Sequence, residues 1–183
     1  VTGPLAEPEI TGRLVSVDTV TVDKVAFALV EAAIAYTHPE VTLTDLQLEP
    51  LAGGSVTGSG NYTLGDPGRL ALQVTGRGLP ADALAGAYGL PEAISIGTLS
   101  LDGEVSGPLD NLSGDFAWQA PDGTYPTRGL ATLERNQITL REAIVQVAGG
   151  TVVATGTLAN RAWNADIVAE GIQLGAFNDS LQG

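Results

Sequence analysis

Hydrophobic and polar residues alternate with period two along much of the chain. The run "RLALQVTG" puts Leu70, Leu72 and Val74 on one side of an extended strand, and "GDFAWQA" does the same for Phe116 and Trp118. Because successive side chains of a strand point to opposite faces, each run predicts a strand with one apolar and one polar face. Turn signals such as "THPE", "GDPG" and "APDG" separate the runs at the spacing typical of all-β folds.

One segment needs a choice between helix and strand. The stretch "TVDKVAFALVEAAIAY" (residues 21–36) is rich in alanine and fits a helical stripe, but we interpret it as two strands because the repeat described below requires it. The one helix we predict is short, from Leu79 to Tyr88. Pro80 suits a first helical turn, and Asp82 favours the positive end of the helix dipole.

A long phrase occurs twice in the chain. "VTLTDLQLEPLAGGSV", starting at Val41, matches "ITLREAIVQVAGGTV", starting at Ile138. The match aligns Gly54 with Gly150, and further along it aligns Gly78 with Gly171. We therefore predict two tandem units, residues 1–89 and 90–183, that continue one another.

Both copies break the alternation in the same way. The apolar residues step by three once in each copy, at Thr44-Asp45 and at Arg141-Glu142. Such a step would turn every later side chain to the wrong face unless a β-bulge absorbs the extra residue. We therefore predict a bulge at both places.

The copies also share a strand whose apolar face is half empty. In the first copy this face carries Val56, Gly58, Gly60 and Tyr62, and in the second it carries Val152, Ala154, Gly156 and Leu158. Glycine inside a strand often marks a close approach. Either bulky neighbours such as Trp163 or Leu70 fill the gap, or the gap is a groove for an apolar ligand of no fixed shape.

Composition excludes several classes of function. Hydrophobic residues make up 44% of the 183 residues and charged residues only 16%, so the chain can bury a large surface. The net charge of −13 and the eight Lys and Arg residues argue against binding nucleic acid or an anionic membrane surface. There is no cysteine and therefore no disulfide. We expect the chain to be part of a longer protein, with any membrane anchor elsewhere.

Catalytic chemistry has few candidates. The only histidine, His38, lies in a predicted hairpin turn, and no nucleophile–base pair or metal-ligand spacing is visible. Asp102, Glu104, Asp110 and Asp115 suggest calcium, but their spacing fits no cation-binding loop. Asp102 and Glu104 alternate with apolar neighbours, so we assign them to the solvent face of a strand. We expect no enzyme activity, no cofactor and no metal.

Several stretches resemble one family. "RGLPADALAGAYGLP", "LSLDGEVSGPLDNLSGDFAWQAPDGTYPTRG", "REAIVQVAGGTVVATGTL" and "RAWNADIVAEGIQLGAF" resemble the repeat region of TamB-family proteins, which are AsmA-like, particularly the long cyanobacterial members related to a chloroplast inner-envelope translocon subunit. The resemblance covers nearly the whole chain. It implies an all-β fold, an elongated, mostly antiparallel sheet curled into a β-taco, that is, a trough with an apolar interior.

The resemblance also implies a function in the periplasm. Family members conduct phospholipid between inner and outer membranes, so the implied partners are phospholipid acyl chains and adjacent repeats of the same longer chain. The alternative is a scaffold that assists outer-membrane protein assembly with a BamA-like partner, whose docking residues cannot be carried over to this chain. A third possibility, which does not come from the resemblance, is a plain adhesin-like β-solenoid or sandwich module with a filled core.

The predicted lipid groove is lined by the apolar residues of the alternating runs. They are Val25, Phe27, Leu29, Leu43, Leu46, Leu48, Val56, Leu70, Leu72, Val74, Ile94, Ile96, Leu99, Leu101, Val105, Phe116, Trp118, Ile138, Leu140, Val145, Val147, Val152, Ala154, Leu158, Trp163 and Ile167. A segment of a longer array would also expose unpaired strands near Arg13–Val22 and Trp163–Ala169, so we expect the chain to associate end to end.

Overall fold

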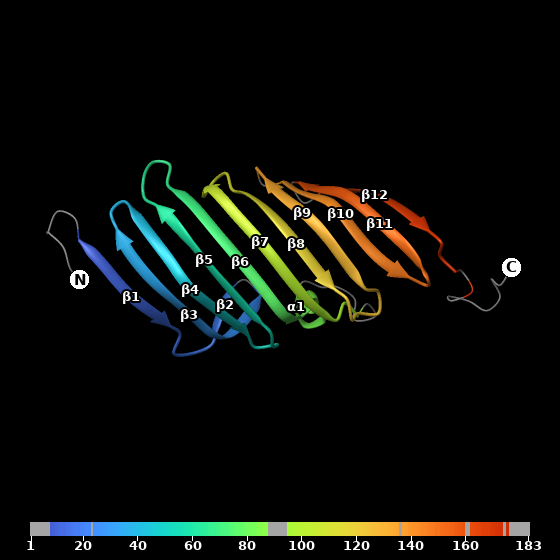
Figure 1. Cartoon of the computed structure of the whole chain (residues 1–183), viewed down its shortest axis with the longest axis horizontal. Coiled ribbons are helices and arrows are strands. Elements are labelled where there is room, and N and C mark those ends of the chain that lie inside the picture. Colours follow the sequence, from blue (N-terminus) through green and yellow to red (C-terminus); the bar gives the residue numbers. More distant parts are fainter. Residues whose placement is uncertain are drawn as a thin grey trace.

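The computed structural model describes residues 8–22, 24–87, 95–135, 137–159, 162–173 and 175. In these residues the chain forms one sheet of twelve strands and one short helix, α1 (Figure 1). The prediction of an all-β fold is confirmed. The strands are β1 (Glu9–Val15), β2 (Val20–Val22), β3 (Val25–Thr37), β4 (Glu40–Pro50), β5 (Ser55–Thr63), β6 (Arg69–Pro80), β7 (Thr98–Pro108), β8 (Ser113–Ala120), β9 (Thr127–Glu134), β10 (Gln137–Val147), β11 (Gly150–Ala159) and β12 (Ala162–Glu170).

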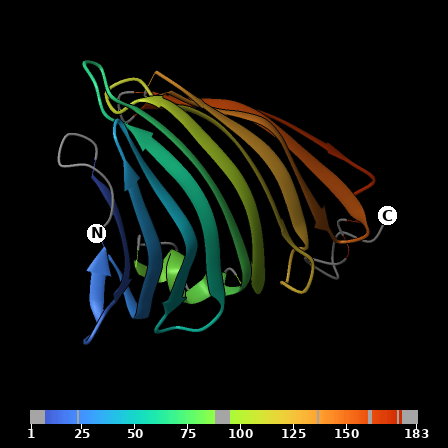
Figure 2. The ribbon, with the colours of Figure 1, turned by 60° about the vertical axis from the view of Figure 1, so that its left-hand side comes forward.

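The strands follow one another across the sheet in nearly sequential order. The order is β1-β3-β4-β5-β6-β7-β8-β9-β10-β11-β12, every neighbouring pair is antiparallel, and β2 pairs with β3. The sheet is open, with β1 and β2 at one edge and β12 at the other, as predicted for the two ends of the chain. Figure 2 shows that the strands bend along their length, so the sheet is a curved layer.

The ambiguous segment forms strands, and the predicted helix is present. Residues 21–36 fall on β2 and β3, which form a hairpin, so the prediction of two strands is confirmed. The predicted helix exists but begins later, because Leu79 and Pro80 still pair with β7 as the end of β6. Helix α1 spans Ala81–Ala87. The predicted end at Tyr88 and the boundary between units near residue 89 lie outside the described residues.

Both predicted bulges are present. The pairing of β4 with β5 shifts between Leu43 and Leu46, and the pairing of β10 with β11 shifts between Leu140 and Ala143. Asp45 has a positive φ of 52° inside the first of these irregularities. The extra residue keeps the later apolar side chains on the same face, which is what the doubled step of three requires.

Matched glycines make matched contacts in the two halves of the chain. Gly54 faces Gly78, since a Cβ built on Gly78 would lie 3.9 Å from the Cα of Gly54. Gly150 faces Gly171 in the same way, at 3.7 Å, and Gly78 and Gly171 both have positive φ. The residues aligned by sequence therefore have the same neighbours, although the division into two tandem units stays a prediction.

The described sheet forms a single layer. The chain, of mass 18.6 kDa, exposes 11814 Å², whereas a compact protein of that mass exposes about 8,200 Å². The buried hydrophobic residues among those described are Ala32, Leu79, Ala81 and Ala120, and no large side chain is fully buried. A sheet normally packs its apolar face on another layer, and among the described residues no such layer is present.

Candidate functional site

The registers divide the sheet into an apolar face and a polar face. We call the side that carries Leu72, Val105 and Leu133 the apolar face, and the side that carries Gln73, Glu104 and Asp115 the polar face. Cross-strand partners lie on the same face, so the pairings can be followed from strand to strand. In the paired registers of the described residues, every charged side chain falls on the polar face.

One row of uncharged residues crosses the apolar face from edge to edge. In order from β1 to β12 it consists of Gly12, Ile34, Leu43, Gly60, Leu72, Val105, Gly114, Leu133, Ile138, Leu158 and Trp163. A second row runs from β4 through Leu46, Gly58, Val74, Gly103, Phe116, Ala131, Leu140, Gly156 and Ala165. A third runs from β3 through Val30, Leu48, Val56, Gly76, Leu101, Trp118, Gly129, Ala143, Ala154 and Ile167.

Glycines stand between bulky side chains at several points along these rows. The ring of Phe116 lies over Gly103, where an added Cβ would come within 2.7 Å of its Cδ1. The Trp118 ring covers Gly129 in the same manner. At these two glycines, which the sequence analysis did not single out, aromatic rings fill the space above the backbone. Cross-strand aromatic–glycine pairs of this kind help to fix the register of a sheet.

The glycines of β5 and β11 have a different neighbour. A Cβ on Gly60 would lie 2.3 Å from the backbone oxygen of Ala71, and one on Gly156 would lie 2.3 Å from the backbone oxygen of Asn164. Gly58 meets the backbone oxygen of Gln73 at 2.6 Å. At each of these glycines the nearest atom is a backbone oxygen, although side-chain atoms of Val74 and Leu46 also lie 3.3 and 3.4 Å from a Cβ built on Gly58. The glycines allow the neighbouring backbone to approach closely, which suits a strongly bent sheet.

The apolar face is only partly covered by its own neighbours. Most of its residues are half-buried, and toward the C-terminal edge they become exposed: Ile138 by 44%, Leu158 by 42% and Ile167 by 65%. Removal of apolar surface from water is favourable by about 25 cal/mol for each Å² that becomes buried. The sheet therefore presents an extended apolar surface that a ligand or another chain can cover.

Most of the predicted groove residues share this face. The registers place there Val25, Phe27, Leu43, Leu46, Leu48, Val56, Leu70, Leu72, Val74, Leu99, Leu101, Val105, Phe116, Trp118, Ile138, Leu140, Val145, Val147, Val152, Ala154, Leu158, Trp163 and Ile167.

Three residues predicted to line the groove are not placed on the apolar face by the registers. Leu29 pairs with Glu49 on the polar face, because the register shifts between Phe27 and Leu29, so the prediction that it shares a face with Phe27 is wrong. Ile96 precedes β7, which begins at Thr98 after the positive-φ Gly97, so the predicted strand does not reach it. Ile94 lies outside the described residues.

Sequence reasoning missed several residues of the apolar face. Ile34 and Leu133 belong to the first row, and Val30 belongs to the third. The signal for Ile34 was an alternation hidden among alanines in "EAAIAY". Leu133 follows Leu130 by three positions, and Leu130 lies on the polar face opposite Ala117, so a strict period of two could not assign both to one face.

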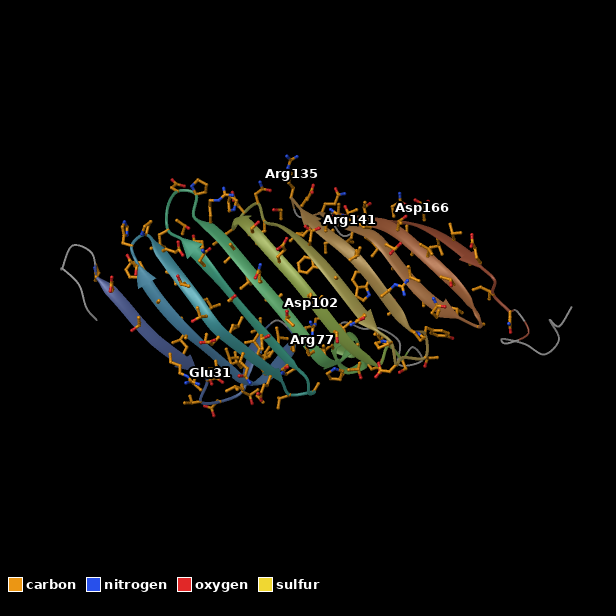
Figure 3. All side chains as sticks on the ribbon, viewed as in Figure 1. Glu31, Arg77, Asp102, Arg135, Arg141 and Asp166 are labelled. Carbon is orange, nitrogen blue, oxygen red and sulfur yellow. The ribbon has the colours of Figure 1, made fainter. Side chains whose placement is uncertain are left out.

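The polar face carries the charges of the sheet. Figure 3 labels Glu31, Asp102, Arg141 and Asp166, which belong to strands from β3 to β12. Arg77 forms an ion pair with Asp102 at 2.9 Å, and Arg141 lies 3.5 Å from Asp115. The hydrogen bond from Arg77, together with one from Thr75, lowers the pKa of the exposed Asp102 carboxyl below its ordinary value. Exposed pairs of this kind contribute little to stability.

Two carboxylates hold the connections around β7. Asp82 of α1 accepts hydrogen bonds from the backbone N–H of Ile96 and from the Ser95 hydroxyl, and these lower its pKa, with the Ile96 bond as the largest cause. Asp122 accepts a hydrogen bond from the backbone N–H of Thr98 at 2.9 Å, and its pKa is lowered mainly by hydrogen bonds with Thr98. The two carboxylates therefore attach α1 and the loop after β8 to the segment at the start of β7.

Several surface hollows lie on the polar face of the described sheet. One of about 440 Å³ crosses β5 to β10 and is lined mainly by polar side chains, among them Gln73, Glu104, Asp115 and Arg141. Within the part of the chain that the structure describes, no three His, Cys, Asp or Glu residues are grouped to hold a metal ion. His38 lies in the turn between β3 and β4, as predicted, with its Nδ1 3.3 Å from the Tyr36 hydroxyl.

The fold and the faces define a class: a single-layer, open antiparallel sheet with an uncharged apolar face. Comparison with protein-family models, with curated proteins and with solved structures found no match. No helix among the described residues is long and apolar enough to span a membrane. The function is therefore argued from the apolar face itself.

Proposed function

We propose that this chain is a non-enzymatic, lipid-conducting segment of a longer TamB-like periplasmic protein. Phospholipid acyl chains lie against the apolar face and move along its rows, across the strands. The observation that carries the proposal is that none of the three rows contains a charged side chain, that the first row crosses the whole sheet, and that no second layer covers the described residues. Across the eleven strands of the main path, such a row is about 48 Å long.

An acyl chain fits this surface for simple physical reasons. Burial of each CH₂ group is favourable by about 0.8 kcal/mol, and no directional contact is needed. The head group stays in water, so it requires no recognition site. A surface of Leu, Val, Ile and Gly holds the chain weakly at every point, which allows movement from one row position to the next.

A second candidate is supported by the open edge of β12. Strand addition to an exposed edge is a general mode of peptide binding, and the family resemblance includes a scaffold for outer-membrane proteins with a BamA-like partner. In that role the client polypeptide would bind to the edge of the sheet and not to its apolar face. The two candidates make different predictions for a charge on the apolar face.

Leu101→Arg provides the test. Leu101 is half-buried on the apolar face, paired with Trp118 and Gly76, so the variant places a charge among the rows. We expect the purified variant to retain at least tenfold less NBD-labelled phosphatidylethanolamine than the wild type. An acyl chain bound there would remove water from an unpaired charge, which costs free energy.

Ser100→Arg is the matched control. Ser100 is the half-buried neighbour on the polar face, opposite Gln119, and lipid retention should be unchanged. Asp102 is a poorer control because it binds Arg77 and Thr75. Equal retention by both variants and the wild type, with both folded by circular dichroism, contradicts lipid binding on this face and leaves the scaffold candidate ahead.

A further inference from the structure

The apolar face ends at two rims, because the strands run from one side of the sheet to the other. We call the rim that carries the turns after β3, β5, β7 and β9 the turn rim. The opposite rim carries α1 and the loop after β8 (residues 121–126), and we call it the helix rim. Figure 1 shows the two rims at opposite ends of the strands. The apolar residues differ in burial and in polarity between the two rims.

At the helix rim the apolar residues are buried. Leu79 of β6 is 5% exposed, Ala81 of α1 is 4% exposed and Ala120 of β8 is 0% exposed. These are three of the four buried hydrophobic residues among those described. Leu79 pairs with Leu99 on the apolar face, and its side chain also covers Gly76, which is the residue of the third row on β6. The apolar face is therefore enclosed at the helix rim between β6 and β8.

Backbone hydrogen bonds join the segments of this rim. The N–H of Ala81 donates to the carbonyl oxygen of Gly97 at 3.0 Å, which joins α1 to the segment before β7. The N–H of Thr124 donates to the carbonyl oxygen of Ser95, also at 3.0 Å, which joins the loop after β8 to the same segment. The apolar end of an acyl chain can rest against this junction, whereas the burial of a charged head group there would cost free energy.

The turn rim carries tyrosines on the apolar face. Its last apolar row consists of Ile10, Tyr36, Val41, Tyr62, Leu70 and Gly107. The Tyr36 hydroxyl lies 3.3 Å from Nδ1 of His38 in the turn after β3. The Cζ atom of Tyr62 lies against Gly68 in the turn after β5, 2.7 Å from where a Cβ would stand. Both rings thus lie on the apolar face with their hydroxyl groups toward the turns, an arrangement that suits a boundary between hydrocarbon and water.

The turn rim is also acidic. The charged residues described at this rim are Glu9, Glu40, Asp66, Arg69, Asp110, Glu134 and Arg135. Five of them are acidic and two are basic, so the rim attracts a cationic group and repels an anionic one. A head group that combines a phosphate with an amine has no net charge and can point its amine at the carboxylates. A head group with a net negative charge has no such compensation.

We propose that a bound phospholipid lies along the strands, with an amine-bearing head group of zero net charge at the turn rim and its acyl chains ending at the helix rim. The inference rests on the proposed function and makes it more specific. From Leu70 to Gly76, β6 spans about 20 Å, and one leaflet of a bilayer holds about 15 Å of hydrocarbon, so the face is long enough for the acyl chains. Movement along the rows then carries the lipid sideways and keeps its head group at one rim.

Tryptophan fluorescence tests the direction of the lipid. Trp163→Phe leaves Trp118 of the third row, nearer the helix rim, as the only tryptophan. Leu70→Trp combined with Trp118→Phe and Trp163→Phe places the only tryptophan at the turn rim. Val41→Trp, in the same row, takes the place of Leu70→Trp if that variant does not fold by circular dichroism. Each protein is titrated with phosphatidylethanolamine that carries a doxyl quencher either near the head group or at the methyl end of an acyl chain.

The two tryptophan positions should respond in opposite ways. Trp118 should be quenched about twofold more by the methyl-end probe, and a tryptophan at position 70 about twofold more by the head-end probe, because the two rows are about 20 Å apart along the strands. Equal quenching at both positions, or the reverse preference, would overturn the direction of the lipid while lipid binding stands. If neither probe quenches at either position, the proposed function fails together with this inference.

Competition tests the head group. Unlabelled phosphatidylethanolamine should displace the quenching lipid at about tenfold lower concentration than phosphatidylglycerol, because the turn rim repels the anionic head group. Asp66→Lys with Asp110→Lys should narrow this difference. Glu104→Lys with Asp166→Lys, the same change of charge at exposed positions of the polar face, should leave it unchanged. Equal displacement by the two lipids from the wild type, or an equal effect of the two double variants, would overturn the assignment of the head group to the turn rim.

Discussion

At the residue scale, glycine has two distinct uses on the apolar face. Gly103 and Gly129 lie under aromatic rings, whereas Gly58, Gly60 and Gly156 make room for a neighbouring backbone oxygen. The sequence showed that the face of β5 and β11 is half empty, but not what fills the space. The deciding fact is the distance to the next strand, which depends on the bend of the sheet and cannot be inferred from side-chain pattern.

Gly60→Ala tests the close approach. The added methyl group meets the backbone oxygen of Ala71, which cannot move without disturbing the ladder. We expect the free energy of unfolding in urea to fall by about 1–3 kcal/mol, the usual cost of overpacking.

Gly12→Ala is the control within the same row. An added Cβ there meets nothing within 4 Å, and stability should change by no more than about 0.5 kcal/mol. If both variants lose the same stability, the backbone contact at Gly60 is not the reason for the glycine.

At the element scale, the strands followed from the alternation of side chains, and the two bulges followed from the repeated step of three. The register shift near Phe27 did not, because alanines on both sides of β3 give no contrast between faces. Leu29 was therefore assigned to the wrong face. The late start of α1 has a similar origin, since Leu79 and Pro80 fit either a helix start or a strand end until β7 is seen to pair with them.

Asp82 links α1 to the segment before β7, and this tie should depend on pH. Its pKa in the folded chain lies below the ordinary value of 3.8, chiefly because the Ile96 N–H donates to the carboxylate. The folded state therefore favours the charged form of the Asp82 carboxyl. The resulting stabilisation is present above pH 3.8 and is lost as the pH falls through the lower, folded-state pKa.

Carbon-detected NMR titration of the Asp82 carboxyl checks this directly. The expected midpoint lies below 3.8, and the amide shift of Ile96 should follow the same curve. Asp82→Asn should abolish the low-pH change at Ile96. A midpoint at or above 3.8, or an Ile96 amide that does not respond, would show that this hydrogen bond is not what holds the segment.

At the scale of the whole molecule, the described residues form a sheet on which no second layer packs. Sequence patterning predicted the all-β class, the open edges and most residues of the apolar face. The rows could not be predicted, since each depends on eight to ten strand registers at once and one wrong bulge shifts every residue after it. Once the registers are known, the separation of charge is complete across the sheet: the apolar face has no charged residue among the described pairs.

The most direct test of that face is photo-crosslinking in cells. A crosslinking amino acid at position 101 points from the apolar face, and one at position 100 points from the polar face of the same strand, with both native residues half-buried. The proposed function predicts that position 101 captures phospholipid and that position 100 does not. Equal capture at the two positions, or capture at neither, would contradict it.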